Sequence, residues 1–143
     1  MHQDFETIFS HFTLGWPTFL NTMPSDGRPS ECLIWVIPVK YDSTVSYYSG
    51  TRHGAKAIID ASSELEDFDV DLGKDSSLVG ISTLPYLEPD VSSPIKMIEV
   101  VESVVEEAFK NDKTPFVLGG EHTLSVGSVS AANKFYDNLS VLY

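Results

Sequence analysis

Apolar residues fall along the chain in short continuous runs that are separated by polar loops. Continuous runs of this length are typical of strands that are buried on both faces of a parallel sheet. The alternation of apolar and acidic residues in FDVDLG, at 68–73, instead predicts a short strand or an exposed edge. The continuous runs predict strands at 32–39 (CLIWVIPV), within 77–85 (SLVGISTLP), at 114–118 (TPFVL) and at 138–143 (NLSVLY).

Other apolar residues recur with helical spacing. The clearest helix is predicted after Ser93, which stands at the cap position directly before Pro94. Its apolar stripe consists of Ile98, Val101, Val105 and either Ala108 or Phe109. Four glutamates lie mainly off this stripe and are expected on a solvated face: Glu99, Glu102, Glu106 and Glu107. Two shorter helices are predicted at 55–65 and 123–136.

Strands and helices alternate over most of the chain. This order predicts an α/β fold with a mostly parallel sheet and with helices on both of its faces. Residues 1–30 contain prolines, a glycine and short polar residues that favour turns, so they predict an arm or loop. Residues 31–143 are expected to form the α/β domain.

The formal net charge of −12 narrows the classes of partner. An acidic surface repels phosphates, so neither nucleic acid nor an anionic membrane is expected, whereas a small cationic molecule suits it. Cys32 is the only cysteine, which excludes an internal disulfide and a cysteine metal cluster. The first residues lack a signal-peptide pattern, and the densest apolar run, at 33–39, is too short to span a bilayer. A cytoplasmic protein is expected.

Two segments are expected at the carboxyl ends of buried strands, where open α/β sheets bind ligands. They are residues 41–54 and the turn Gly119–His122. A histidine in such a turn can offer a neutral imidazole nitrogen to a metal, so His122 is a candidate ligand. The alternative is a hydrogen-bonded structural histidine. Asp42 is the second candidate, although an aspartate in a polar loop can equally cap a turn.

The spacing within GGEHTLSVG, at 119–127, excludes several other kinds of site. It lacks the glycine pattern of a dinucleotide-binding loop and the Gly-Lys-Ser/Thr ending of a P-loop. Ser125 and Ser128 do not form a nucleophile elbow, and His122 lacks the second histidine of a zinc protease helix.

Two blocks of the sequence resemble the ureohydrolase family of agmatinases and arginases. In the block PFVLGGEHTLSVGSVSAANKFYDNLSVLY, a strand ends in Gly-Gly-Glu-His before a helix, as in that family. The earlier block, YDSTVSYYSGTRHGAKAIIDASSELEDFDVDLG, resembles agmatinases more than arginases. The similarity spans residues 34–143. This chain departs from the family pattern at Tyr48 and at Gly54-Ala55, and it lacks an Asp-x-Gly-Asp pattern before the long helix.

The resemblance implies an arginase-like three-layer fold, incomplete at the C-terminus, and the hydrolysis of a guanidinium group to urea and an amine. For an agmatinase the substrate is agmatine and the amine is putrescine. The family reaction uses a hydroxide bridged by two Mn²⁺ ions. By motif match His122 is the first metal ligand, whereas Glu121 is not carried over as one. Asp42 and Tyr47 are candidates for the substrate loop.

The resemblance also implies that the remaining ligands and the catalytic residues lie beyond Tyr143, in Asp-Ala-His-x-Asp and Asp-x-Asp segments. The chain is therefore expected to be the N-terminal part of such an enzyme and to be inactive alone. A homo-oligomer, trimeric or hexameric, is implied as well. The alternatives are another ureohydrolase (a guanidinobutyrase, a formimidoylglutamase or an arginase) and a non-catalytic α/β module that pairs with other subunits.

Overall fold

The computed structural model describes residues 17–22 and 29–142. Most of the predicted arm, 1–30, therefore lies outside the described residues. Within it the structure has one short 3-10 turn, η1 (Phe19–Asn21), whose Phe19 amide donates a hydrogen bond of 2.9 Å to the Thr83 hydroxyl. This contact attaches the turn to the sheet.

Three parallel strands form the central sheet, in the order β4 (Ile81–Thr83), β1 (Ile34–Pro38) and β5 (Thr114–Leu118). β1 lies between the other two, and its last residue, Pro38, is in register with Leu118 at the end of β5. Each strand lies inside the run that predicts it, and the expected parallel α/β arrangement is confirmed.

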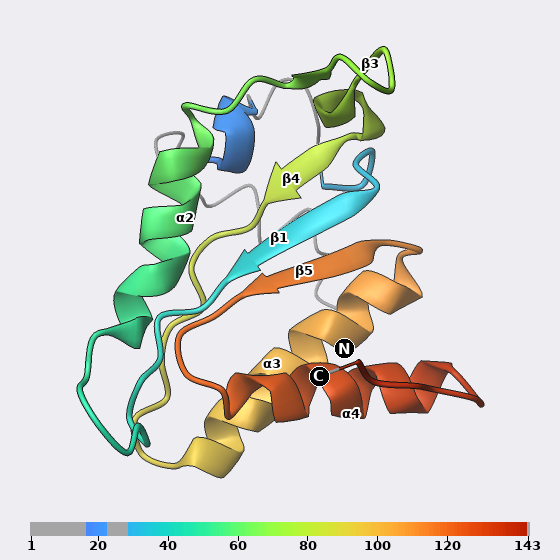
Figure 1. Ribbon diagram of the computed structural model, residues 1–143. Coiled ribbons are helices and arrows are strands. Elements are labelled where there is room, and N and C mark those ends of the chain that lie inside the picture. Colours follow the sequence, from blue (N-terminus) through green and yellow to red (C-terminus); the bar gives the residue numbers. More distant parts are fainter. Residues whose placement is uncertain (1–16, 23–28, 143) are drawn as a thin grey trace.

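Successive side chains of β1 point to opposite faces of the sheet, as in any strand. Val36 packs against Ile59 in one hydrophobic cluster, and Trp35 and Ile37 belong to the other. The helices that complete these clusters are α2 (Gly54–Ser62) on the Val36 face, and α3 (Pro94–Lys110) and α4 (Leu124–Phe135) on the opposite face. Figure 1 shows the resulting three layers, with α2 on one side of the sheet and α3 and α4 on the other.

The long helix α3 begins at Pro94 as predicted. Ser93 has the extended N-cap conformation, although its side chain makes no capping hydrogen bond. The buried stripe includes Val101, Val105 and Ala108 as expected, and Met97 is buried in place of Ile98. No helix within residues 17–22 and 29–142 combines the length and the apolar character needed to cross a membrane.

Two of the glutamates on α3 do not lie on a solvated face. The Lys134 ammonium of α4 lies 2.7 Å from the Glu102 carboxylate and also contacts the carboxylate of Glu106. The side chains of Glu102 and Glu106 are only about one fifth exposed. The hydrogen bond with Lys134 lowers the pKa of Glu106, and those with Glu102 and Glu106 raise the pKa of Lys134. These ion pairs connect the two helices of one layer.

The second predicted helix ends earlier than expected. α2 stops at Ser62, whereas the apolar spacing extends to residue 65. The hydroxyls of Ser62 and Ser63 donate hydrogen bonds of 2.7 Å to the backbone carbonyls of Ile59 and Asp60. Serine hydroxyls compete in this way with the backbone hydrogen bonds of a helix, which favours an end at this point.

Short elements lie between β1 and α2, and between α2 and β4. The predicted strand in FDVDLG is confirmed as β2 (Phe68–Asp69), which pairs antiparallel with β3 (Lys74–Asp75). The remaining elements are two short 3-10 helices, η2 (Thr51–His53) and η3 (Ser76–Val79).

The predicted strand at 138–143 is wrong for residues 138–142, which form no ladder. Val141 and Leu142 are exposed. A strand needs a neighbour that satisfies its backbone N–H and C=O groups. After α4 the chain instead turns back along the helix layer (Figure 1).

Candidate active site

The strand order creates a crevice at one edge of the sheet. From β1 the chain passes through α2 to β4 on one side, then through α3 to β5 on the other side of β1. The connections therefore diverge at the carboxyl ends of β1 and β5, and such a switch point is where open α/β sheets bind ligands. The loop after β1 and the turn after β5 meet here. The Glu121 amide donates a hydrogen bond of 2.9 Å to the Tyr41 carbonyl.

The turn after β5 needs a glycine at position 120 because the backbone of the loop lies directly against it. A Cβ on Gly120 would stand 1.9 Å from the Tyr41 carbonyl oxygen, so no other residue fits without a backbone shift. A Cβ on Gly119 would stand 3.1 Å from Cδ1 of Leu124, which is the end of a flexible side chain. Close backbone approach at Gly120 thus holds the loop and the turn together.

Both segments line one open cavity of about 790 Å³. Its volume lies within the range of small-molecule sites. The loop contributes residues 44–48 and Thr51, and the turn with α4 contributes residues 119–125, Ser128 and Val129. None of the described residues that line the cavity is a lysine or an arginine, and Glu121 brings a carboxylate. The cavity therefore suits a cationic ligand better than a phosphate.

His122 lies in the turn directly before α4, and its side chain is exposed at the cavity. Its backbone carbonyl accepts a hydrogen bond of 3.0 Å from the Ser125 amide, which belongs to the start of the helix. Residues 17–22 and 29–142 contain no group of three or more His, Cys, Asp or Glu side chains that could hold a metal ion. The described residues therefore form no closed metal site around His122.

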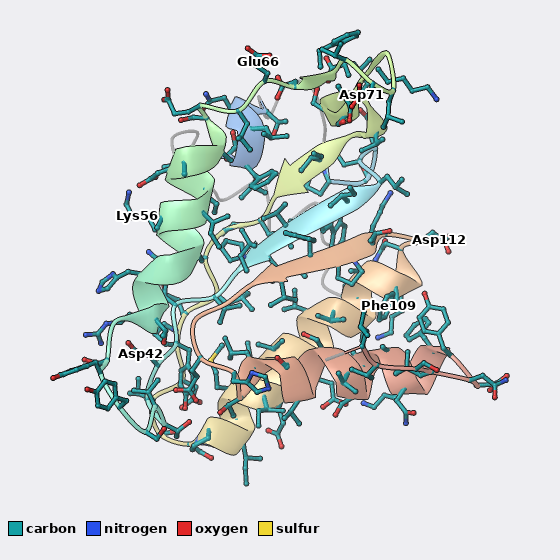
Figure 2. All side chains as sticks on the ribbon, viewed as in Figure 1. Asp42, Lys56, Glu66, Asp71, Phe109 and Asp112 are labelled. Atoms are coloured by element: carbon teal, nitrogen blue, oxygen red, sulfur yellow. The ribbon has the colours of Figure 1, made fainter. Side chains whose placement is uncertain are left out.

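Asp42, labelled in Figure 2, belongs to the loop after β1 and is not among the residues that line the cavity. It is buried, and Oδ2 of its carboxylate accepts hydrogen bonds from the amides of Gly50, at 2.7 Å, and Arg52, at 3.4 Å. The Arg52 guanidinium stands 3.5 Å from Oδ1. The hydrogen bond from Gly50 lowers the pKa of Asp42, and the amide and charge of Arg52 lower it further. Burial acts in the opposite direction. Asp42 thereby closes the loop on itself.

Tyr47 lies at the exposed tip of the loop and lines the same cavity as His122. Its ring packs edge-on against Tyr48, with the ring centroids 4.3 Å apart. An exposed aromatic face can attract a cation such as a guanidinium. Of the three residues singled out from the sequence, the structure brings His122 and Tyr47 to one cavity, and it places Asp42 in support of the loop.

The sequence assigned no role to Thr44 and Glu121, which form the main polar contact across the crevice. Glu121 is only 7% exposed. Its Oε2 accepts a hydrogen bond of 2.7 Å from the Thr44 amide, and its Oε1 accepts one from the Thr44 hydroxyl. Burial raises the pKa of Glu121, but the hydrogen bonds from Thr44 and Thr123 outweigh it, and the net pKa is lowered. The only feature of the sequence that pointed to this contact was an acidic residue directly after the two glycines of the turn.

Comparisons with known proteins agree on one family. Residues 33–143 match the arginase family. The N(1)-aminopropylagmatine ureohydrolase of Synechocystis sp. is 29% identical over 129 residues, which are 86% of this chain and 42% of that protein. The agmatinase of Halalkalibacterium halodurans is 28% identical over 119 residues, which are 83% of this chain and 40% of that protein.

A solved structure is similar as well. The crystal structure of the agmatine ureohydrolase of Thermoplasma volcanium matches with a TM-score of 0.72 at 29% identity, over 88% of this chain and 41% of that one. This chain thus spans about two fifths of the length of these relatives. The family match extends over well more than half of the chain and includes both segments that line the cavity. The chain belongs to the arginase family.

Proposed function

We propose that this chain supplies one metal ligand, His122, and one wall of the substrate pocket to an agmatinase-type ureohydrolase. The reaction would hydrolyse the guanidinium group of agmatine to urea and putrescine, a step in the synthesis of polyamines. The observation that carries this proposal is the shared cavity. His122 and Tyr47, from segments more than 70 residues apart, line the same hollow at the switch point of the sheet.

The described residues fit the expected metal centre only in part. A neutral imidazole nitrogen is a good ligand for a divalent metal, but Mn²⁺ prefers several oxygen ligands and a defined geometry. Two-metal hydrolysis needs ions about 3.5–4 Å apart, which one histidine cannot hold. The nearby carboxylates of Asp42 and Glu121 are engaged by the backbone of the loop. The further ligands are proposed to come from the parts of the relatives that this chain does not span.

The chain's own residues are proposed to bind and orient the substrate. Agmatine is cationic and elongated, and the cavity wall offers it aromatic rings, hydroxyl groups and no competing positive side chain from the described residues. The ring of Tyr47, which lines the cavity, is proposed to receive the guanidinium by a cation–π contact. The formal net charge of −12 would favour the approach of such a substrate.

N(1)-aminopropylagmatine is a second candidate substrate. The Synechocystis relative bears the name of that activity, and so does a 32% identical relative from Thermus thermophilus. The two substrates share the guanidinium group and differ in the length of the amine. The cavity is open to solvent, and we propose that the longer amine would extend through this opening.

The proposal predicts activity when the missing part of the enzyme is supplied. In the test, residues 33–142 replace the corresponding segment of the Thermoplasma volcanium enzyme, and urea release is measured with Mn²⁺ and each substrate. We expect the chimera to release urea from agmatine or aminopropylagmatine, and the 143-residue chain alone to release none. L-Arginine is the control substrate. A folded chimera that releases no urea from either amine would favour the non-catalytic module.

Removal of the Tyr47 ring is expected to weaken substrate binding. In the active chimera, Tyr47→Ala should raise the KM for agmatine by about 2- to 30-fold, which corresponds to the loss of one cation–π contact. Tyr47→Phe retains the aromatic face and should change KM little. Steady-state kinetics of the two variants decide this point, and an equal rise of KM in both would assign the effect to the hydroxyl group and not to the ring.

A further inference from the structure

A buried carboxylate joins the loop after β1 to the turn after β5. Glu121 accepts hydrogen bonds from both the amide and the hydroxyl of Thr44, a residue 77 positions away in the sequence. The hydroxyl of Thr123 lies 3.3 Å from the Thr44 hydroxyl and extends this contact toward α4. Hydrogen bonds to an ionised acceptor are shorter and stronger than those between neutral groups. The contact is therefore a strong link between two separate segments.

The loop that carries Tyr47 is held at both of its ends. Glu121 fixes its beginning at Thr44, and Asp42 fixes its end through the amide of Gly50. Tyr47 and Tyr48 lie between the two attachments and are themselves exposed. No backbone hydrogen bond of a strand or helix orders residues 44–48 in the structure. The position of the tip thus depends on the two carboxylates.

We propose that Glu121 is a positioning residue: its carboxylate locks Thr44 against the β5–α4 turn and so sets where Tyr47 stands relative to His122. The carboxylate faces the loop and is not available as a metal ligand. The effect on substrate rests on the proposed function, whereas the attachment of the loop does not depend on it.

The attachment is tested by hydrogen exchange on the 143-residue chain. In Glu121→Ala the amide of Thr44 is expected to exchange at least about tenfold faster than in the unchanged chain, because it loses its acceptor. Glu121→Gln keeps one acceptor oxygen, so its exchange rate should lie between those of Glu121→Ala and the unchanged chain. The control is Glu99→Ala, which removes an exposed carboxylate from α3 and should leave the rate at Thr44 unchanged.

The partner residue provides the matched test. Thr44→Val removes the hydroxyl and should accelerate exchange, whereas Thr44→Ser retains it and should restore the original rates. The amides of β1 report on global stability and should change little in every variant. If the amide of residue 44 exchanges at the same rate in Glu121→Ala, Thr44→Val and the unchanged chain, the proposed lock does not exist.

A kinetic measurement separates positioning from metal binding. In the active chimera, Glu121→Gln should raise the KM for agmatine by about tenfold and leave kcat and the Mn²⁺ content within about threefold. A loss of Mn²⁺ together with unchanged exchange of the loop would overturn the proposal and make Glu121 a ligand. A chimera without any activity would contradict the proposed function alone, since the exchange experiment on the chain still decides whether the lock exists.

Discussion

Replacement of His122 by alanine in the chimera is expected to reduce kcat/KM for the guanidinium substrate by at least about 100-fold. Loss of a residue that only hydrogen-bonds a metal ligand lowers metal affinity or activity by about 10- to 100-fold, so loss of a direct ligand should lower them more. The same variant should bind less Mn²⁺ than the unchanged chimera. Urea release and metal analysis after dialysis measure the two effects.

His53→Ala is the matched control for this substitution. His53 ends η2 and is exposed, and it is not among the residues that line the cavity. Its replacement should change both activity and metal content by less than about twofold. If His122→Ala behaves like His53→Ala, the ligand role of His122 is refuted and the structural alternative stands.

Replacement of Gly120 by alanine is expected to destabilise the fold more than any other glycine substitution in the turn. The added Cβ would stand 1.9 Å from the Tyr41 carbonyl oxygen, and this neighbour is backbone that cannot rotate away. Overpacking of this kind reduces the free energy of unfolding by about 3 kcal/mol, which lowers the Tm of a chain of this size by about 6–12 °C. Thermal unfolding followed by circular dichroism measures the shift.

Gly119→Ala serves as the comparison because it lies in the same turn. Its Cβ would meet only Cδ1 of Leu124, at 3.1 Å, and that side chain can adjust. We expect a Tm loss of less than about 3 °C for this variant, since the smaller contact costs under about 1 kcal/mol. Equal losses for both variants would mean that the approach of Tyr41 to Gly120 does not hold the crevice together.

The pattern of the sequence predicted the elements that bury continuous apolar runs. β1 lies within its predicted run because helices cover both of its faces, so almost every residue had to be apolar. β5 also lies within its run, but it is buried only at Leu118 and leaves Thr114 and Phe116 exposed, so the expected burial on both faces is wrong for this strand. α3 was equally clear, since one face of it packs on the sheet and Pro94 marks its beginning. The family match and the α/β fold follow from these same segments.

Features that depend on distant partners were not predictable from local pattern. Residues 138–143 were expected to be a strand, but a strand requires a neighbour and none of the described strands pairs with residues 138–142. The link between Glu121 and Thr44 joins residues 77 apart, and an acidic residue in a glycine turn does not reveal which partner it contacts. The ion pair of Lys134 with Glu102 likewise depends on how α4 crosses α3.

The proposed role of His122 is to bind a metal at the switch point of the sheet. The most direct measurement is a crystal structure of the chimera with Mn²⁺, with diffraction data recorded on both sides of the manganese absorption edge. We expect an anomalous manganese peak within bonding distance of an imidazole nitrogen of His122, at the cavity that Tyr47 also lines. A manganese peak elsewhere, with the His122 imidazole hydrogen-bonded only to protein, would contradict it.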